Sequence, residues 1–299
     1  MNRIFAASEN LRGIGLMIVG RIVFAASDTF TKLASEGLPA SEVVVLRNGI
    51  ALPIVVLMAW RLGGLKHLRS IRDPALLWRS VLEGIGLLAF VMALPHVQLG
   101  QSTVILLTVP IILVALSALL FKEQVGWRRW TAILVGFAGV FLVAGPLSGT
   151  PNIYLLLTQV TAITWAVRDL ITSRISRAIP SITISLMTIL ISAGVAAPGA
   201  LAGDWRGFGT QEALYLLASG CFVAVANLLY ISALRTGAIA VVAPFRYTAA
   251  VWAMIAGYIV WGDVLDIWGA AGTLFIIGSG LYTFYRELEL ARKRRALTR

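Results

Sequence analysis

The sequence predicts an all-α membrane protein whose ten transmembrane helices form two inverted five-helix repeats. Hydrophobic residues make up 59% of the 299 positions and charged residues only 13%, and the mean hydropathy is +0.87. A water-soluble domain of this length would need a far more polar surface. A helix needs about 20 consecutive apolar residues to cross a bilayer, and ten such segments with short connections account for the chain.

Charged, glycine-rich or proline-containing connections separate the ten apolar segments. The longest polar connections, 61–74 and 203–210, are too short to fold as a catalytic or ligand-binding domain. We therefore expect spans near residues 12–35, 41–61, 75–96, 100–121, 127–145, 152–174, 180–202, 211–234, 239–261 and 266–286.

The two halves of the chain resemble each other when one is shifted by about 141 residues, a sign of internal duplication. In chain order the following features match: 24–28 with 165–169, Leu38-Pro39 with Ile179-Pro180, Leu99-Gly100 with Thr236-Gly237, Glu123 with Asp263, and Gly136 and Gly139 with Gly269 and Gly272. We expect a first repeat at 12–145, a second at 152–286 and a Gly/Pro/Ser-rich linker between them.

Each predicted repeat has five spans, which is an odd number, so the second must insert upside down relative to the first. The two repeats are then related by a pseudo-two-fold axis in the membrane plane. This architecture suits alternating access to a site near the middle of the membrane. Gene duplication without such a function is the alternative.

The net charge of +11 is unevenly distributed along the chain. If the N-terminus is cytoplasmic, the basic residues outside the spans all fall in cytoplasmic segments, except for Arg206. This bias predicts cytoplasmic N- and C-termini and argues against a nucleic-acid partner. The tail at 287–299 is expected in the cytoplasm, where its basic residues 292–295 either touch anionic lipid headgroups or only stop transfer.

The sequence resembles the ten-helix EamA-type members of the drug/metabolite transporter (DMT) superfamily over nearly its whole length. The resemblance rests on the five-plus-five repeat, the acids Glu123 and Asp263 after the fourth span of each half, the glycine-rich fifth spans, and the stretch 243–248 leading to Gly257-Tyr258. The pattern is most similar to YddG-like bacterial amino-acid exporters. Asp263 departs from the usual glutamate. The resemblance implies export of amino acids or similar metabolites across the inner membrane.

Ionisable residues within spans are costly unless paired or hydrated, so each is a candidate for function. Arg21 and Asp28 lie two turns apart on one face of the first span. Glu83 lies beside Gly84 in the third span, where it either binds a substrate ammonium, carries a proton, or pairs with Arg79 one turn earlier.

Arg246 is the strongest single candidate for a substrate-binding or gating residue. A guanidinium deep in the ninth span can hold a carboxylate through two hydrogen bonds, and its structural alternative is an ion pair with Asp28, Glu83 or Asp169. Tyr247 adds a hydroxyl or an aromatic wall. Pro110 and Pro244 predict helix bends in the fourth and ninth spans.

Several other residues in the predicted spans are either candidates for function or have a structural explanation. Trp165, Asn227 and Tyr230 are candidates to line the substrate site, with packing as the alternative. Arg168 and Asp169 are expected to find separate structural partners, because adjacent helical residues point about 100° apart. His96 is expected to be interfacial rather than a proton relay. Tryptophans near span ends are expected to form an interface belt, namely Trp78, Trp127, Trp130, Trp261 and Trp268.

The sequence argues against several other functions. It contains no HExxH, GxSxG or GxxxxGK[ST] motif, two histidines and one cysteine, so we expect no enzyme, metal, cofactor or direct use of ATP. An intramembrane enzyme is the less favoured alternative. A channel would need polar or charged rings, which the apolar spans do not offer.

The residues together predict a secondary transporter in the bacterial inner membrane, whose partners are the lipid bilayer and a small molecule. We expect Arg246 to meet a substrate carboxylate, and Asp28 or Glu83 to meet an ammonium group. The sparse polarity favours zwitterions with apolar side chains over multiply charged solutes. Coupling to protons and facilitated diffusion both stay open, as does transport of a nucleoside, vitamin or cationic drug on the same fold.

Overall fold

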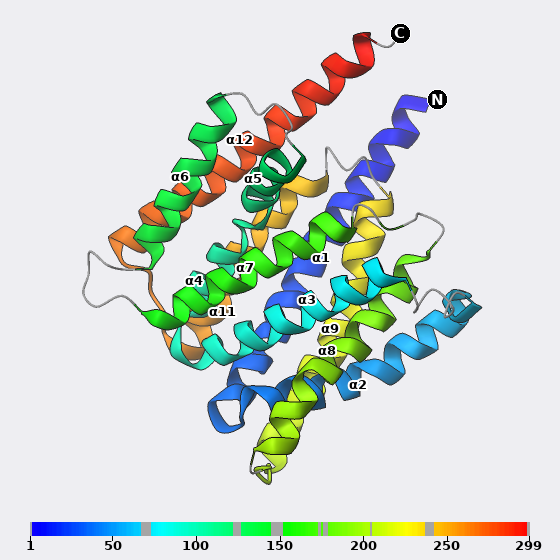
Figure 1. Ribbon diagram of the computed structural model, residues 1–299, viewed down its shortest axis with the longest axis vertical. Coiled ribbons are helices and arrows are strands. Elements are labelled where there is room, and N and C mark those ends of the chain that lie inside the picture. The colour runs from blue at the N-terminus through cyan, green and yellow to red at the C-terminus, as the bar shows by residue number, and fades with distance from the viewer. Residues whose placement is uncertain are drawn as a thin grey trace.

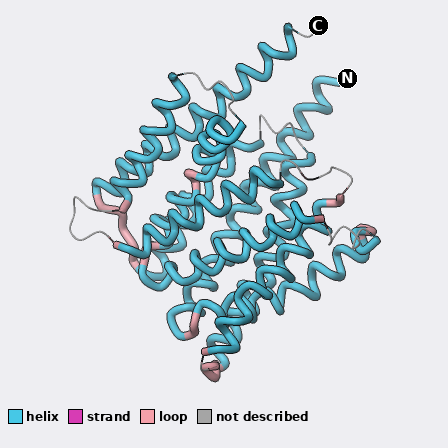
Figure 2. Tube along the Cα trace, viewed as in Figure 1, coloured by secondary structure: helices cyan, strands magenta, loops and turns pink. Residues whose placement is uncertain are grey.

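The computed structural model describes residues 2–66, 73–121, 127–144, 152–172, 175, 179–203, 205–236 and 242–297, and most of these residues are helical. No strand occurs in these ranges, and both termini lie at one end of the bundle (Figures 1 and 2). The elements are α1 (Asn2–Gly37), α2 (Ala40–Arg61), α3 (Pro74–Ala93), η2 (Leu94–His96), α4 (Leu99–Leu106), α5 (Val109–Phe121), α6 (Trp127–Val143), α7 (Ile153–Thr172), α8 (Ser181–Ala202), α9 (Thr210–Thr236), η3 (Ala243–Tyr247), α11 (Thr248–Trp261) and α12 (Ile267–Leu297).

Helix occupies most of each of the ten predicted spans. In the described part of the chain, seven helices are long and apolar enough to cross a membrane by length and composition. The other three predicted spans fall short for visible reasons: α6 has only 17 residues, α7 is diluted by threonines, Arg168 and Asp169, and the ninth span is interrupted. The ten-span, two-repeat layout therefore stays a prediction.

The last helix is longer than predicted. We expected the final span to end near residue 286, but α12 continues as one helix to Leu297. No glycine or proline occurs after Gly280, and the segment is rich in Glu, Leu, Ala and Arg, which are good helix formers. The backbone of the basic tail is thus helical to Leu297, and residues 298–299 lie outside the described part.

The predicted fourth and ninth spans are both interrupted. Between α4 and α5 the amides of Leu107 and Thr108 bond to carbonyls three residues earlier, and Pro110 follows, which has no N–H to donate. The ninth span begins with the 3₁₀ segment η3, which contains Pro244, before α11. In each interruption a threonine hydroxyl donates to the carbonyl three residues before it, from Thr108 at 2.6 Å and from Thr248 at 2.7 Å.

The most extensive helix packing joins the two predicted repeats. α1 packs on α9, α3 on α7, α2 on α8, α6 on α12 and α4 with α11, as Figure 1 shows for the α3–α7 and α6–α12 pairs. These pairs are symmetric between the two halves. The first helix of each half packs on the third helix of the other half, and the second, fourth and fifth helices pack on their equivalents.

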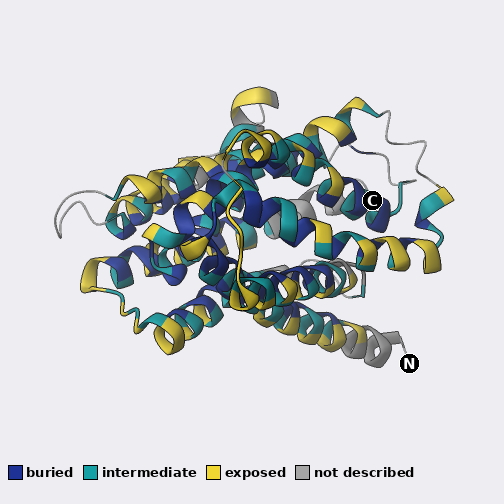
Figure 3. Cartoon of the chain, turned by 90° about the horizontal axis from the view of Figure 1, so that it is seen from below, coloured by how far each residue is buried: buried dark blue, intermediate teal, exposed yellow. Residues whose placement is uncertain are grey.

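Many large apolar residues are exposed. Figure 3 shows the exposed residues along the outer faces of the bundle and the buried residues between the helices. Leu201, Ile259 and Ile267 are each more than 70% exposed. Such a surface is unsuited to water and suited to lipid. Trp78 and Trp127 are also exposed on this surface.

Glycines let α6 and α12 approach backbone to backbone. A Cβ atom on Gly139 would lie 2.7 Å from the Gly272 carbonyl oxygen, whereas a Cβ on Gly278 would meet nothing within 4 Å.

We expect Gly139→Ala to lower the free energy of unfolding by about 1–3 kcal/mol through overpacking, measured by unfolding of the purified protein in detergent. Gly278→Ala is the matched control and should be neutral or slightly stabilising. Equal stability of the two variants would show that the helices separate freely.

Candidate functional site

A polar and aromatic cluster lies midway along α1. Arg21, Phe24 and Asp28 are spaced by three and four residues, so α1 presents them on one face. The Arg21 guanidinium carbon lies 4.8 Å from the centre of the Tyr230 ring and 5.6 Å from that of Phe24. The two rings meet edge to face at 6.4 Å. The cation therefore lies against an aromatic wall built by α1 and α9.

Arg47 on α2 faces this cluster. Its side chain is buried, with 4% of the residue exposed. Asp28 is the carboxylate that acts most strongly on Arg47, and Glu83 is the second. Asp28 in turn lies in the fields of Arg47 and Arg21, yet within the described part of the chain it forms no ion pair at 4.0 Å or less. The carboxylate thus acts on both guanidinium groups without a direct ion pair to either.

The 3₁₀ segment η3 brings Arg246 to the same region. Arg246 and Arg21 act on each other as like charges, and Nε of each is buried without a hydrogen-bond partner. In the described part of the chain, Arg246 forms no ion pair with Asp28, Glu83 or Asp169, the three partners that we considered for it. Its guanidinium therefore lies in the field of a second cation, and within the described part of the chain it has no ion pair at 4.0 Å or less.

Tyr247 points away from Arg246. It is 7% exposed and packs among apolar side chains that include Val104, Ala250 and Ile276. Its hydroxyl has no hydrogen-bond partner and lies against Gly280 of α12. This placement favours a packing role for the ring over contact with a substrate.

Glu83 is neutralised by a partner that we did not expect. Arg168 donates from Nη1 to Glu83, and its Nε and Nη2 lie 2.9 and 2.8 Å from the Asp169 carboxylate. The expectation that Arg168 and Asp169 find separate partners is therefore wrong, because the long arginine side chain folds back over its neighbour. Arg79 does not pair with Glu83 but donates to the hydroxyls of Thr172 and Thr188.

The remaining candidates lie on α7 and α9. Trp165 packs on Phe90 at 6.1 Å and on the Arg168 guanidinium at 5.1 Å. Its indole Nε1 is buried and unpartnered beside Gly86. Asn227 is half-buried one turn before Tyr230 on α9. Trp165 thus belongs with the Glu83–Arg168 pair, while Asn227 and Tyr230 share the helix that borders Arg21.

A second charged group closes the end of the bundle opposite the termini. Lys32 is 4% exposed. It donates to the Val97 carbonyl at 2.8 Å, lies 3.8 Å from Asp263, and lies 4.3 Å from the centre of the Trp261 ring. Trp261 donates to Glu36 at 2.7 Å. We call Lys32, Glu36, Trp261 and Asp263 the latch. Trp261, expected in an interface belt, instead joins α1 to α11.

Nearby, the exposed His96 stacks on Tyr154 with ring centres 3.8 Å apart, and its carbonyl accepts from Asn152. This contact ties η2 to the start of α7. The interfacial position that we expected for His96 stays a prediction.

Sequence reasoning singled out neither Lys32 nor Arg47. Both were visible as basic residues inside apolar segments. Lys32 also follows Asp28 by four residues and precedes Glu36 by four, which places the three charges on one helix face. That spacing was the available signal for the latch.

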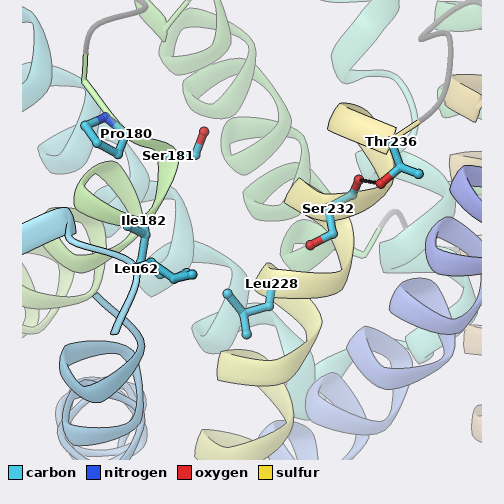
Figure 4. Close-up of a pocket in the computed structure, with 7 residues that line it drawn as sticks. All are labelled: Leu62, Pro180, Ser181, Ile182, Leu228, Ser232 and Thr236. Atoms are coloured by element: carbon cyan, nitrogen blue, oxygen red, sulfur yellow. Dashed lines mark hydrogen bonds between the residues drawn. The ribbon is translucent and has the colours of Figure 1, made fainter. Parts of the chain in front are cut away.

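A pocket of about 290 Å³ lies at the end of the bundle that carries the termini. The end of α2, the start of α8 and the end of α9 form it, and Figure 4 shows the α9 side chains facing Leu62 and Ile182. Its lining residues are Leu62, Pro180, Ser181, Ile182, Leu228, Ser232 and Thr236. Sequence reasoning did not identify any of them.

Known proteins resemble this chain along most of its length. An S-adenosylmethionine uptake transporter of Rickettsia bellii (strain RML369-C) is 24% identical over 286 residues, covering 94% of this chain and 96% of that protein. A riboflavin transporter of Vibrio cholerae is 27% identical, covering 95% and 97%. The pseudopaline exporter CntI of Pseudomonas aeruginosa is 23% identical, covering 89% and 93%.

A solved crystal structure matches the fold with a TM-score of 0.61 at 17% identity, covering 92% of this chain and 95% of that one. The sequence pattern of the EamA-like transporter family matches residues 11–145 and again residues 152–285. These matches confirm the resemblance to the DMT superfamily, and the relatives are transporters rather than enzymes. This multi-pass membrane protein, with its long apolar helices, therefore belongs to the EamA-like transporter family.

Proposed function

We propose that this protein is a secondary transporter that exports amino acids or similar small metabolites across the bacterial inner membrane by alternating access. The observation that carries this proposal is the group of half-buried charges, Arg21, Arg246 and Asp28, beside the interrupted ninth span. Charged groups deep in a bilayer are costly and mark substrate pathways. Discontinuous helices commonly form such sites in transporters.

In this proposal the moving parts are the two repeats, 12–145 and 152–286, with cytoplasmic termini. The helix packing between the halves, which is unchanged when the halves are exchanged, supports an inverted pair. Closure at the latch and the pocket at the termini end support an inward-facing state. Rocking of the repeats would then open the latch and close the pocket.

Arg246 would hold the substrate carboxylate, and Asp28 the ammonium group. Tyr230 and Phe24 would form an aromatic wall, with Asn227 nearby as a further polar contact. Glu83 is no longer favoured for the ammonium, because Arg168 already neutralises it. Trp165 remains a candidate at the border of the site through its unpartnered indole N–H.

Counterflow in proteoliposomes tests this function. Vesicles that contain the purified protein are preloaded with one unlabelled amino acid at a time, and a labelled amino acid is supplied outside. Saturable accumulation that depends on the internal solute supports a carrier. No accumulation across the panel, with the protein shown to be folded, would refute amino-acid transport.

The relatives favour a second candidate, which is transport of a different small metabolite on the same fold, in either direction. Their names cover uptake of S-adenosylmethionine, transport of riboflavin and export of pseudopaline. The same vesicles can be loaded with these three compounds. Repeating the assay with an imposed pH gradient separates proton coupling from facilitated diffusion.

Arg246→Ala is expected to reduce counterflow at least about 10-fold, because a charge-assisted hydrogen bond to a carboxylate contributes about 1.5–3 kcal/mol. Arg61→Ala, at the exposed end of α2, is the matched control and should transport normally. Labelled solute uptake and the melting temperature are measured for both variants. Normal transport by a folded Arg246→Ala protein would contradict the assignment of the carboxylate to Arg246.

A further inference from the structure

The charges in the middle of the bundle do not balance. Arg168 is neutralised by Glu83 and Asp169, and Lys32 is held at the latch by Asp263. Arg21, Arg47 and Arg246 remain. Asp28 acts on both Arg21 and Arg47, whereas Glu83, which also acts on Arg47, is already paired with Arg168. An uncompensated excess of positive charge in a low-dielectric interior is unfavourable, so the site is incomplete without an anion.

Buried N–H donors without a hydrogen-bond partner independently indicate that an anion is missing. Nε of Arg21, Nε of Arg246, and both Nε and Nη1 of Arg47 are buried without a partner. Buried polar groups in folded proteins are nearly always hydrogen-bonded to protein, water or ligand. All these groups are N–H donors, so the ligand that completes them must supply acceptor oxygens.

Arg47 is the most constrained of the three arginines. Its own backbone is fixed against α9, since a Cβ atom on Gly220 would lie 2.9 Å from the Arg47 carbonyl oxygen. The residue is only 4% exposed, so its guanidinium is enclosed by the protein. Arg168 shows what a purely structural arginine looks like in this bundle, because it is saturated by two carboxylates. In Arg47, by contrast, two buried nitrogens, Nε and Nη1, have no hydrogen-bond partner.

We propose that Arg47 binds a second acidic group of the substrate, so that the preferred substrates carry at least two carboxylates. One carboxylate would be held by Arg246 and the other by Arg47. Two negative charges together with Asp28 balance the three guanidinium groups. This inference rests on the proposed transport function, and it reverses the sequence-based expectation that multiply charged solutes are disfavoured.

Matched acid and amide pairs test the proposal. The probes are L-glutamate against L-glutamine and succinate against succinamate, which have similar shapes and differ by one carboxylate. Two readouts are used: competition in counterflow, and the rise in melting temperature of the detergent-purified protein, which reports binding without turnover. For the wild-type protein, the acid should act at about 10-fold lower concentration than its amide, because an Arg–carboxylate contact is charge-assisted and can be bidentate.

Arg47→Gln is expected to bring the acid-to-amide preference close to one. Arg79→Gln is the matched control, since it removes a guanidinium from the neighbouring helix that is committed to Thr172 and Thr188, and the preference should persist. If Arg47→Gln does not fold, two other variants decide. Arg47→Lys should retain the preference in weaker form, and Asp28→Asn should increase it.

The outcomes separate this inference from the proposed function. Amino-acid counterflow without an acid preference in the wild type overturns the inference and leaves the transporter. A preference that survives in Arg47→Gln, or that is unchanged in both Arg47→Lys and Asp28→Asn, also overturns it. Acid-specific stabilisation that is lost in Arg47→Gln, without amino-acid counterflow, supports the inference and refutes amino-acid transport. Absence of both acid-specific counterflow and acid-specific stabilisation overturns the inference.

Discussion

Replacing Arg168 with alanine is expected to lower the free energy of unfolding by about 3–5 kcal/mol, the cost of leaving buried charges without their partner. Arg168 bridges Glu83 on α3 and Asp169 on α7, and the side chains of Arg168 and Glu83 are each only 16% exposed. Without the guanidinium, two carboxylates would face each other across the α3–α7 interface. Unfolding of the purified protein in detergent measures the loss.

Arg286→Ala is the matched control for this prediction. Arg286 pairs with Glu289 three residues along α12, where the two side chains are 25% and 33% exposed. A partly exposed pair of this kind contributes about 0–1 kcal/mol. Combining Arg168→Ala with Glu83→Gln and Asp169→Asn should restore much of the lost stability. If Arg168→Ala were no more harmful than Arg286→Ala, the bridge would not hold the two helices together.

The general fold could be predicted from sequence because apolar segments of span length leave few alternatives. The interruption of the ninth span was foreseen only as a bend at Pro244, since a missing N–H indicates where a helix is weak but not that five residues become 3₁₀ helix. The extension of α12 was missed because hydropathy marks where a membrane ends. It does not mark where a helix ends.

The candidate site was harder to predict than the fold. The sequence shows which ionisable residues lie in spans, but their pairing depends on which helices are neighbours and on how far a long side chain reaches. Arg168 illustrates both, since it reaches Glu83 on a helix 85 positions away and also folds back on Asp169. Arg47 could not be given a role from sequence, because its significance lies in the partners it lacks.

Lys32→Met is expected to increase the accessibility of the closed end of the bundle by about 10-fold or more. The substitution keeps the bulk of the side chain and removes the bond to the Val97 carbonyl, the contact with Asp263 and the cation over Trp261. A hydrogen bond from a charged donor contributes about 1.5–3 kcal/mol, and a loss of 1.4 kcal/mol from one of two states shifts their ratio about 10-fold. The open state, in which α1 and α11 separate, should gain that population.

The reporter for this change is a cysteine at Ala253, introduced after Cys221 is replaced by alanine. Ala253 is 2% exposed and packs with Ala34, Leu94 and Leu99, a cluster against which Trp261 of the latch also packs. A membrane-impermeant thiol reagent applied from the latch side should label it slowly in the wild-type background and faster in Lys32→Met. Labelling from the termini side should move in the opposite direction, because alternating access links the two ends.

Two further variants show whether the charge itself holds the latch. Gln98→Ala removes a 3.3 Å hydrogen bond to the Val264 carbonyl on the same face without touching the charged group, and labelling should stay within about 2-fold, since an ordinary hydrogen bond contributes only about 0.5–1.5 kcal/mol. Trp261→Phe keeps an aromatic ring for Lys32 and loses the bond to Glu36, so its effect should lie between the two. Equal labelling in Lys32→Met and Gln98→Ala would mean that apolar packing behind the latch, and not Lys32, keeps this end closed.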